Sequence, residues 1–252
     1  MHDPGHVLMK QDGFKVRTTP HRLHTTSQTL QFANHVQNGG VYCPEMAHLI
    51  SDRASAQIFE HEKSRQAILE EIESLRDFWS RCDAFVIEIS ALREHHGDLD
   101  GRKVIVNNFS ARDQEKHKDR VALEAERGVS LPVIPIGFET SSASQAHASM
   151  AAIKSVLKKP IIWVCHQRPP SDDPKYEVVN KVRLHLANTI KSGAEALGDA
   201  FFDPSTVAAE IGQEVFFQNR GEDLDHMTPE AAEVLAGRYG TILREVAALK
   251  TS

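Results

Sequence analysis

The residues best suited to acid–base chemistry lie near the end of the chain, where Asp223 stands three positions before His226. A helix start, Thr228-Pro229-Glu230, follows at once, and Thr228 can cap this helix. A carboxylate beside an imidazole fixes its tautomer and stabilises the imidazolium, so the ring can accept a proton from a hydroxyl group. We therefore predict that His226 is a general base oriented by Asp223, with Asp225 as the alternative acid.

Two other interpretations of this segment stay open. His226 can instead be a surface or capping histidine ahead of the helix. Asp223, Asp225 and His226 can also be read as metal ligands, but the further ligands that a metal site needs are not evident in the sequence. We therefore expect no metal and no cofactor.

A general base needs a hydroxyl group to activate, and Ser27 is the first candidate. It stands in the run His21 to Gln28 (HRLHTTSQ), at the expected start of a helix. Free backbone N–H groups and the positive end of the helix dipole can stabilise an oxyanion there. The alternative is that Thr26 or Ser27 only caps the helix. His24 is either a substrate contact or a polar surface residue.

Further candidates follow apolar strands. Glu88 lies inside such a run, where a carboxylate is costly unless it is paired, so we expect an Arg or His partner. Ser90 ends the same run. His166 and Arg168 follow the clearest strand, and ligands bind at the carboxyl ends of strands in open α/β sheets. We predict that these four residues contact substrate. The alternatives are an edge or solvated face for Glu88, a hydroxyl capping a strand exit for Ser90, and ordinary loop polarity for His166 and Arg168.

Strands and helices alternate along the chain. Short apolar runs predict strands at residues 84–90, 103–109, 133–138 (where Pro135 favours an edge or a loop) and 159–165, with a short extended piece at 200–203. Helical spacing predicts helices at residues 27–36, 54–81, 144–157, 174–197 and from 228 or 229 to 249. This alternation predicts an α/β three-layer sandwich with a mostly parallel central sheet.

The predicted helix at residues 174–197 carries its apolar residues on one stripe. Its members recur every three or four positions and are Val178, Val182, Leu186, Ile190, Ala194 and Leu197. A strand-end cysteine in an apolar run is usually an inert buried thiol, which is what we expect of Cys165.

Whole-chain properties set the class of protein. The chain is 40% hydrophobic and 25% charged, which is ordinary for a globular protein. We expect a single domain over residues 1–252, with an irregular segment at 1–55. The net charge of −6 argues against nucleic-acid binding. No apolar stretch reaches the roughly 18 residues of a membrane span. With three widely spaced cysteines and no visible secretion signal, the expected location is cytoplasmic. The sequence does not indicate the oligomeric state.

Three segments together resemble the SGNH (GDSL-type) hydrolases. They are residues 82–90 (CDAFVIEIS), residues 160–170, and Asp223-x-x-His226 with the helix start after it. The resemblance implies an SGNH- or flavodoxin-like fold and a serine esterase or acyltransferase. It also implies a small-molecule or glycan substrate, such as an acylated saccharide.

The family's nucleophile motif, Gly-Asp-Ser, does not occur in this sequence, and neither does Gly-x-Asn-Asp. Three explanations stay open: the serine is presented in another way, the chain begins downstream of the first strand, or the chemistry has been lost. The alternative function is therefore a non-catalytic module of the same fold that binds a glycan or a protein. A structural subunit of a larger complex is a third possibility.

Overall fold

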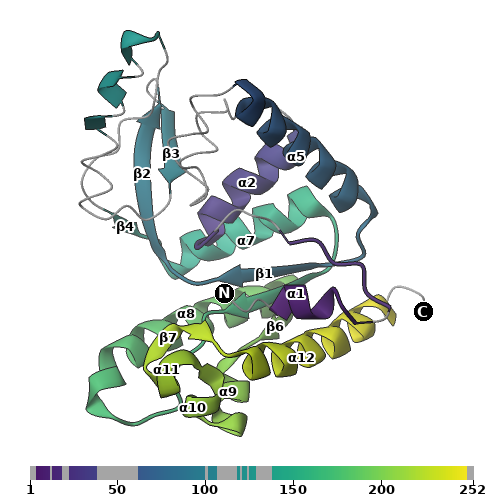
Figure 1. Cartoon of the computed structure of the whole chain (residues 1–252), viewed down its shortest axis with the longest axis vertical. Helices are drawn as coiled ribbons and strands as arrows, with labels where there is room; N and C mark the ends of the chain where they lie inside the picture. Colours follow the sequence, from purple (N-terminus) through teal and green to yellow (C-terminus); the bar gives the residue numbers. More distant parts are fainter. Residues whose placement is uncertain are drawn as a thin grey trace. The chain divides into compact units, whose positions relative to one another are not determined.

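The structure is a computed structural model (Figure 1) that describes residues 4–11, 13–18, 23–38, 62–99, 102–106, 118–119, 121–123, 125–128 and 138–248. The chain divides into two compact units. Unit 1 comprises Met1–Thr18, Cys82–Ala91 and Lys158–Ser252, and unit 2 comprises Thr19–Arg81 and Leu92–Leu157. The single-domain prediction is not tested by this division, because units that share one chain in alternating stretches can still fold together.

Unit 1 contains a parallel sheet of three strands in the order β1-β5-β6. The strands are β1 (Phe85–Ile89), β5 (Ile161–Cys165) and β6 (Ala200–Phe202). All five residues of the central strand β5 are buried, as expected of an unbroken apolar run covered on both faces. The predicted strands at residues 84–90 and 159–165 are therefore confirmed, and they are neighbours in the sheet.

Helices and one short strand complete unit 1. The long helices are α8 (Glu177–Leu197) and α12 (Pro229–Ala248). The shorter elements are α1 (Pro4–Leu8), η1 (Pro174–Tyr176), α9 (Ser205–Ile211), α10 (Gln213–Phe216), α11 (Gln218–Gly221) and β7 (Asp223–Met227). Ile162 and Val164 of β5 share a core cluster with Phe216, Phe217 and Leu235, so α10 and α12 cover one face of this strand. Because side chains alternate along a strand, Trp163 faces the other side.

The apolar stripe predicted on α8 is only partly buried. Leu186, Ile190 and Ala194 are buried, whereas Val178 and Val182 are 76% and 63% exposed. A 21-residue helix is about 32 Å long, whereas a five-residue strand spans about 17 Å, so the sheet covers only part of α8.

In its described residues, unit 2 combines long helices with an antiparallel sheet. The helices are α2 (Thr26–Asn38), α5 (Glu62–Arg81) and α7 (Ala143–Leu157), and α2 packs against both of the others. The strands, in the order β3-β2-β4, are β2 (Arg93–Leu99), β3 (Arg102–Val106) and β4 (Glu139–Thr140). The Gln31 side chain of α2 donates to the carbonyl of Ile105 and accepts from its N–H, at 2.8 and 2.9 Å, and so binds β3.

The predicted three-layer sandwich is not confirmed. The strand expected at residues 103–109 exists as β3, but it pairs antiparallel with β2, which was not predicted. Among the strands that the structure describes, the parallel pairing thus lies in unit 1. The strand expected at 133–138 falls almost entirely outside the described residues. The first part of the helix expected at 54–81, before Glu62, also lies outside them. Within the described ranges, no helix is long and apolar enough to cross a membrane.

Candidate active site

The predicted acid and base of the C-terminal segment are in contact. His226 Nδ1 lies 2.9 and 2.8 Å from the two carboxylate oxygens of Asp223, and both residues belong to β7. Because a carboxylate can only accept, Nδ1 carries the proton and the Nε2 lone pair is left to accept one. The hydrogen bond from His226 holds the pKa of Asp223 below its usual value. The His226 side chain is 41% exposed, and its Nε2 has no hydrogen-bond partner in the part of the chain that the structure describes.

The turn between β7 and α12 fixes the position of His226. Thr228 Oγ1 accepts the Ala231 N–H at 3.1 Å, which is the predicted N-cap of the last helix. The same hydroxyl donates to the carbonyl of Val215 at 2.5 Å. Gln218 donates to the carbonyl of Met227 at 2.8 Å. The residues on the C-terminal side of His226 are therefore tied to α10, α11 and α12.

A second histidine lies at the carboxyl end of the parallel sheet. His166 follows β5. Its backbone N–H donates to the carbonyl of Ile89 at 3.2 Å, and this bond extends the pairing of β1 and β5. Its Nδ1 is 3.2 Å from Glu88 Oε1 and its Nε2 is 3.5 Å from Asp225 Oδ1. Burial lowers the pKa of His166, but the hydrogen bonds with Asp225 and Glu88 outweigh burial and raise it overall. Glu88 thus has the histidine partner that its place in an apolar strand predicted.

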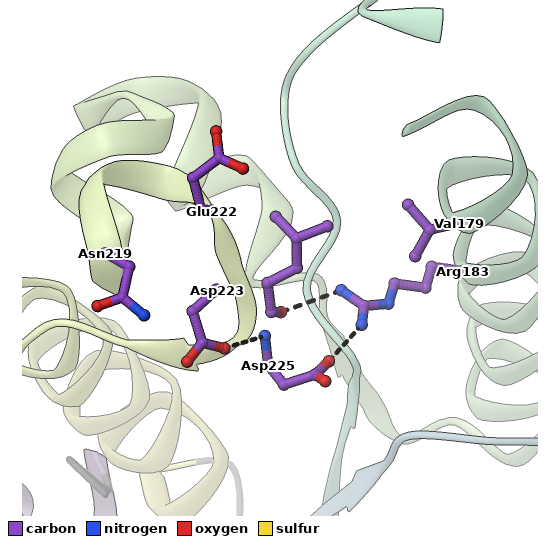
Figure 2. A pocket seen from close by; sticks show the side chains of 7 residues that line it. Val179, Arg183, Asn219, Glu222, Asp223 and Asp225 are labelled. Atoms are coloured by element: carbon purple, nitrogen blue, oxygen red, sulfur yellow. Dashed lines mark hydrogen bonds and ion pairs between the residues drawn. The ribbon is translucent and has the colours of Figure 1, made fainter. Parts of the chain in front are cut away.

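Arg183 of α8 binds the same region. Its side chain is 12% exposed and donates to Asp225 Oδ1 at 2.6 Å (Figure 2). It also donates to the carbonyls of Leu224 at 3.1 Å and Gln167 at 2.9 Å. The hydrogen bond from His166 and the charge of Arg183 together hold the pKa of Asp225 far below its usual value. Arg183 therefore joins β7 to the segment that leaves β5.

An open depression of about 540 Å³ lies beside this network. Figure 2 shows the residues that line it, which are Val179, Arg183, Asn219, Glu222, Asp223, Leu224 and Asp225. Its volume falls within the usual range of ligand sites. Asn219 and Arg220 have left-handed backbone angles, with φ of 52° and 56°, and Gly221 follows with φ of 87°. This bend turns the chain into β7 directly before Asp223.

Arg168, predicted to contact substrate, has partners within unit 1. Its guanidinium donates to Asp203 Oδ2 at 2.6 Å, and its backbone N–H donates to Ser205 Oγ at 2.8 Å. Burial raises the pKa of Asp203, but the bonds from Ser205 and Arg168 lower it further than burial raises it. Cys165 is buried, and burial followed by the charge of Asp203 raises the pKa of its thiol, as suits an inert cysteine. A substrate role for Arg168 stays a prediction.

Ser27 and His24 lie at the start of α2, in unit 2, whereas His226 belongs to unit 1. Ser27 Oγ is 3.2 Å from Ser149 Oγ of α7. Thr25 Oγ1 accepts the Gln28 N–H at 3.1 Å, so Thr25 caps this helix, and not Thr26 or Ser27. The roles of Ser27 as nucleophile and of His24 as substrate contact stay predictions.

Ser90 is half-buried and directly follows β1, so it lies at the same carboxyl edge of the sheet as His166. Its role as a substrate contact is likewise untested.

Two residues of this region were not predicted from the sequence. Arg183 lies between members of the apolar stripe on α8, and nothing local to it indicates a partner in β7. Asp203 had a detectable signal, because it is an acid directly after a short strand and so stands at the carboxyl edge of the sheet.

Comparison with known proteins gives one family. Residues 1–239 match the model of the TviD N-terminal domain. No curated protein and no solved structure matches the chain. The match does not confirm the resemblance to SGNH hydrolases. Because it covers nearly all of the 252 residues, the chain belongs to the family of TviD N-terminal domains.

Proposed function

We propose that this protein is an ester hydrolase or acyltransferase of SGNH type that acts on an acylated saccharide or a similar polar substrate. Its family is that of a capsular-polysaccharide acetyltransferase, which supports a saccharide as the substrate. The observation that carries the proposal is the contact of His226 Nδ1 with Asp223 at 2.8 Å, with the opposite side of a partly exposed ring open to a hydroxyl group.

In the proposed reaction, His226 Nε2 removes the proton of a serine hydroxyl while the oxygen attacks the acyl carbonyl carbon. Asp223 stabilises the imidazolium that forms. His226 then gives this proton to the departing alkoxide, and an acyl-enzyme remains. In the second half, His226 deprotonates a saccharide hydroxyl or water, whose oxygen takes the acyl group. His226 then returns this proton to the departing serine oxygen, which restores the serine hydroxyl. Transfer and hydrolysis differ only in this acceptor.

The depression beside Asp223 is the proposed place for the polar substrate. Asn219 and Glu222 line it with amide and carboxylate groups, which can bond to the hydroxyl groups of a saccharide. We propose Ser27 as the nucleophile and Ser90 as a substrate contact. The experiment below distinguishes these two roles.

A fluorophosphonate probe, which labels activated serines, tests the proposal on the full chain. We expect the wild type to be labelled, and His226→Ala and Asp223→Asn to lose most of the labelling. His185→Gln is the matched control, because His185 is an exposed histidine on α8. Ser27→Ala and Ser90→Ala then identify the labelled serine.

Failure of the wild type to react with the probe, or to turn over acetyl esters, would favour the non-catalytic binding module. Labelling that survives His226→Ala would remove His226 from the mechanism.

A further inference from the structure

Asp225 links the two histidines of unit 1. Its carboxylate faces His166 Nε2 at 3.5 Å and receives the Arg183 guanidinium at 2.6 Å. Its backbone N–H donates to Asp223 Oδ1 at 3.2 Å, and Asp223 in turn holds His226. A continuous path of polar contacts therefore runs from His166 to the proposed base.

We propose that His166 is a positioning residue for the proposed reaction: with both ring nitrogens protonated, it ties Asp225 of β7 to Glu88 of β1 and so holds Asp223 and His226 in their hydrogen-bonded geometry. The inference rests on the proposed function, because it gives His166 a role in that reaction. His166 itself touches no reacting atom in this scheme.

The chemistry of the ring supports this role. A doubly protonated imidazole has two N–H donors, one for each carboxylate, whereas a neutral ring has one donor and one lone pair. Neutral His166 would therefore turn its lone pair towards either Glu88 or Asp225, and that contact would become repulsive. Three charged groups face the ring: Glu88 from β1, Asp225 from β7 and Arg183 from α8.

β7 depends on such ties because it is not part of either sheet. Its backbone pairing consists of the isolated bridges Phe217↔Met227 and Gln218↔Asp223. Arg183 supplies a connection that persists at all accessible pH values, since a guanidinium stays charged. His166 supplies a connection that depends on its protonation.

The direction of the pH effect follows from the raised pKa of His166. The connection is complete below the ordinary histidine pKa of about 6.5 and is lost as the pH rises through the higher value in the folded protein. The proposed base needs the opposite protonation state, because His226 must be neutral to accept a proton. Activity should therefore fall on the alkaline side when His166 loses its proton.

Nuclear magnetic resonance of the full chain with ¹⁵N-labelled histidine tests the coupling without turnover. We expect the proton on His226 Nδ1 to give the downfield signal of a carboxylate-bonded N–H. This signal should weaken with rising pH at the midpoint at which His166 titrates, and His166→Gln should remove that pH dependence. A His226 signal that ignores the titration of His166 would overturn the proposal.

Hydrolysis of p-nitrophenyl acetate supplies the second readout. We expect His166→Gln to lower kcat by about 10- to 100-fold, because a small misplacement of His226 has a cost of this size. KM should change little. Its pH profile should lose the alkaline limb, whereas the His185→Gln control should keep the wild-type profile. An unchanged alkaline limb in His166→Gln would refute the role.

If His166→Gln does not fold, Glu88→Gln replaces it. This variant removes one of the two carboxylates and should move the alkaline limb to lower pH; a limb that stays in place would refute the proposal. The two proposals fail separately. Turnover that survives His226→Ala would refute the proposed function while the magnetic resonance coupling still stands. Coupling that is absent in an active, His226-dependent enzyme would refute only the role of His166.

Discussion

His226 and His166 both bond to aspartates of the same five-residue strand, yet they have different surroundings. His226 has one carboxylate on one side and is 41% exposed, whereas His166 has a carboxylate at each nitrogen and is 15% exposed. A ring with one carboxylate can still exchange a proton on its open side. A ring between two carboxylates is favoured as a cation, which suits the proposed anchor. The number of carboxylates around the imidazole thus separates the proposed base from the proposed support.

The largest effect should come from the base itself. His226→Gln is expected to lower turnover of p-nitrophenyl acetate by about 10²- to 10⁴-fold, the usual contribution of general base catalysis. His166→Gln is expected to cost less, because it acts through β7. Initial rates of the two variants at one pH check this order. Equal losses would mean that the two histidines have the same role, and the comparison would fail.

Arg183 tests whether β7 is anchored from α8. Arg183→Met should lower the free energy of unfolding by about 2 kcal/mol, because charge-assisted hydrogen bonds to Asp225 and to two carbonyls are lost from a largely buried side chain. Arg183→Lys should recover part of this loss, since it keeps the charge but not the planar geometry. Urea unfolding measures both. Lys181→Met, at an exposed position of the same helix, is the control and should have little effect.

The pH dependence of the unfolding free energy tests whether His166 anchors β7. Because the pKa of His166 is raised in the folded protein, its contribution is fully present below about pH 6.5 and disappears as the pH rises through the folded value. The difference in unfolding free energy between the wild type and His166→Gln should therefore shrink with rising pH. Urea unfolding at a series of pH values checks this. A difference that grows with pH would contradict the anchor.

The smallest effect concerns the bend at Asn219 and Arg220, directly before β7. Arg220 has a left-handed backbone with φ of 56°, so Arg220→Gly should raise the free energy of unfolding by about 0.5–1 kcal/mol. Asn219→Gly should gain less, because asparagine tolerates this conformation. Thermal unfolding of the two variants measures the difference. A larger gain for Asn219→Gly would contradict this explanation.

The sequence predicted what depends on neighbouring residues. The pair Asp223 and His226 is separated by three positions, so its contact was visible in the sequence, as was the cap at Thr228. Strands β1 and β5 were found because nearly continuous apolar runs are typical of parallel strands.

Contacts between distant segments were not predictable in the same way. The sequence predicted an Arg or His partner for Glu88, which is 52% exposed, but only the pairing of β1 with β5 identified it as His166. β2 escaped detection because its sequence, REHHGDL, lacks the apolar alternation of a typical strand. The exposure of Val178 and Val182 depends on where the sheet ends, and helical periodicity carries no information on that.

The interrupted path of the chain through unit 1 has a consequence for biosynthesis. β1 leaves the ribosome before residues 92–157, and its partner β5 follows only after them. Until then, the apolar strand has no neighbour, and closing so long a loop slows folding. Nascent chains arrested before Ile161 should therefore bind chaperones and aggregate more readily than the finished protein, because an unpaired apolar strand promotes association.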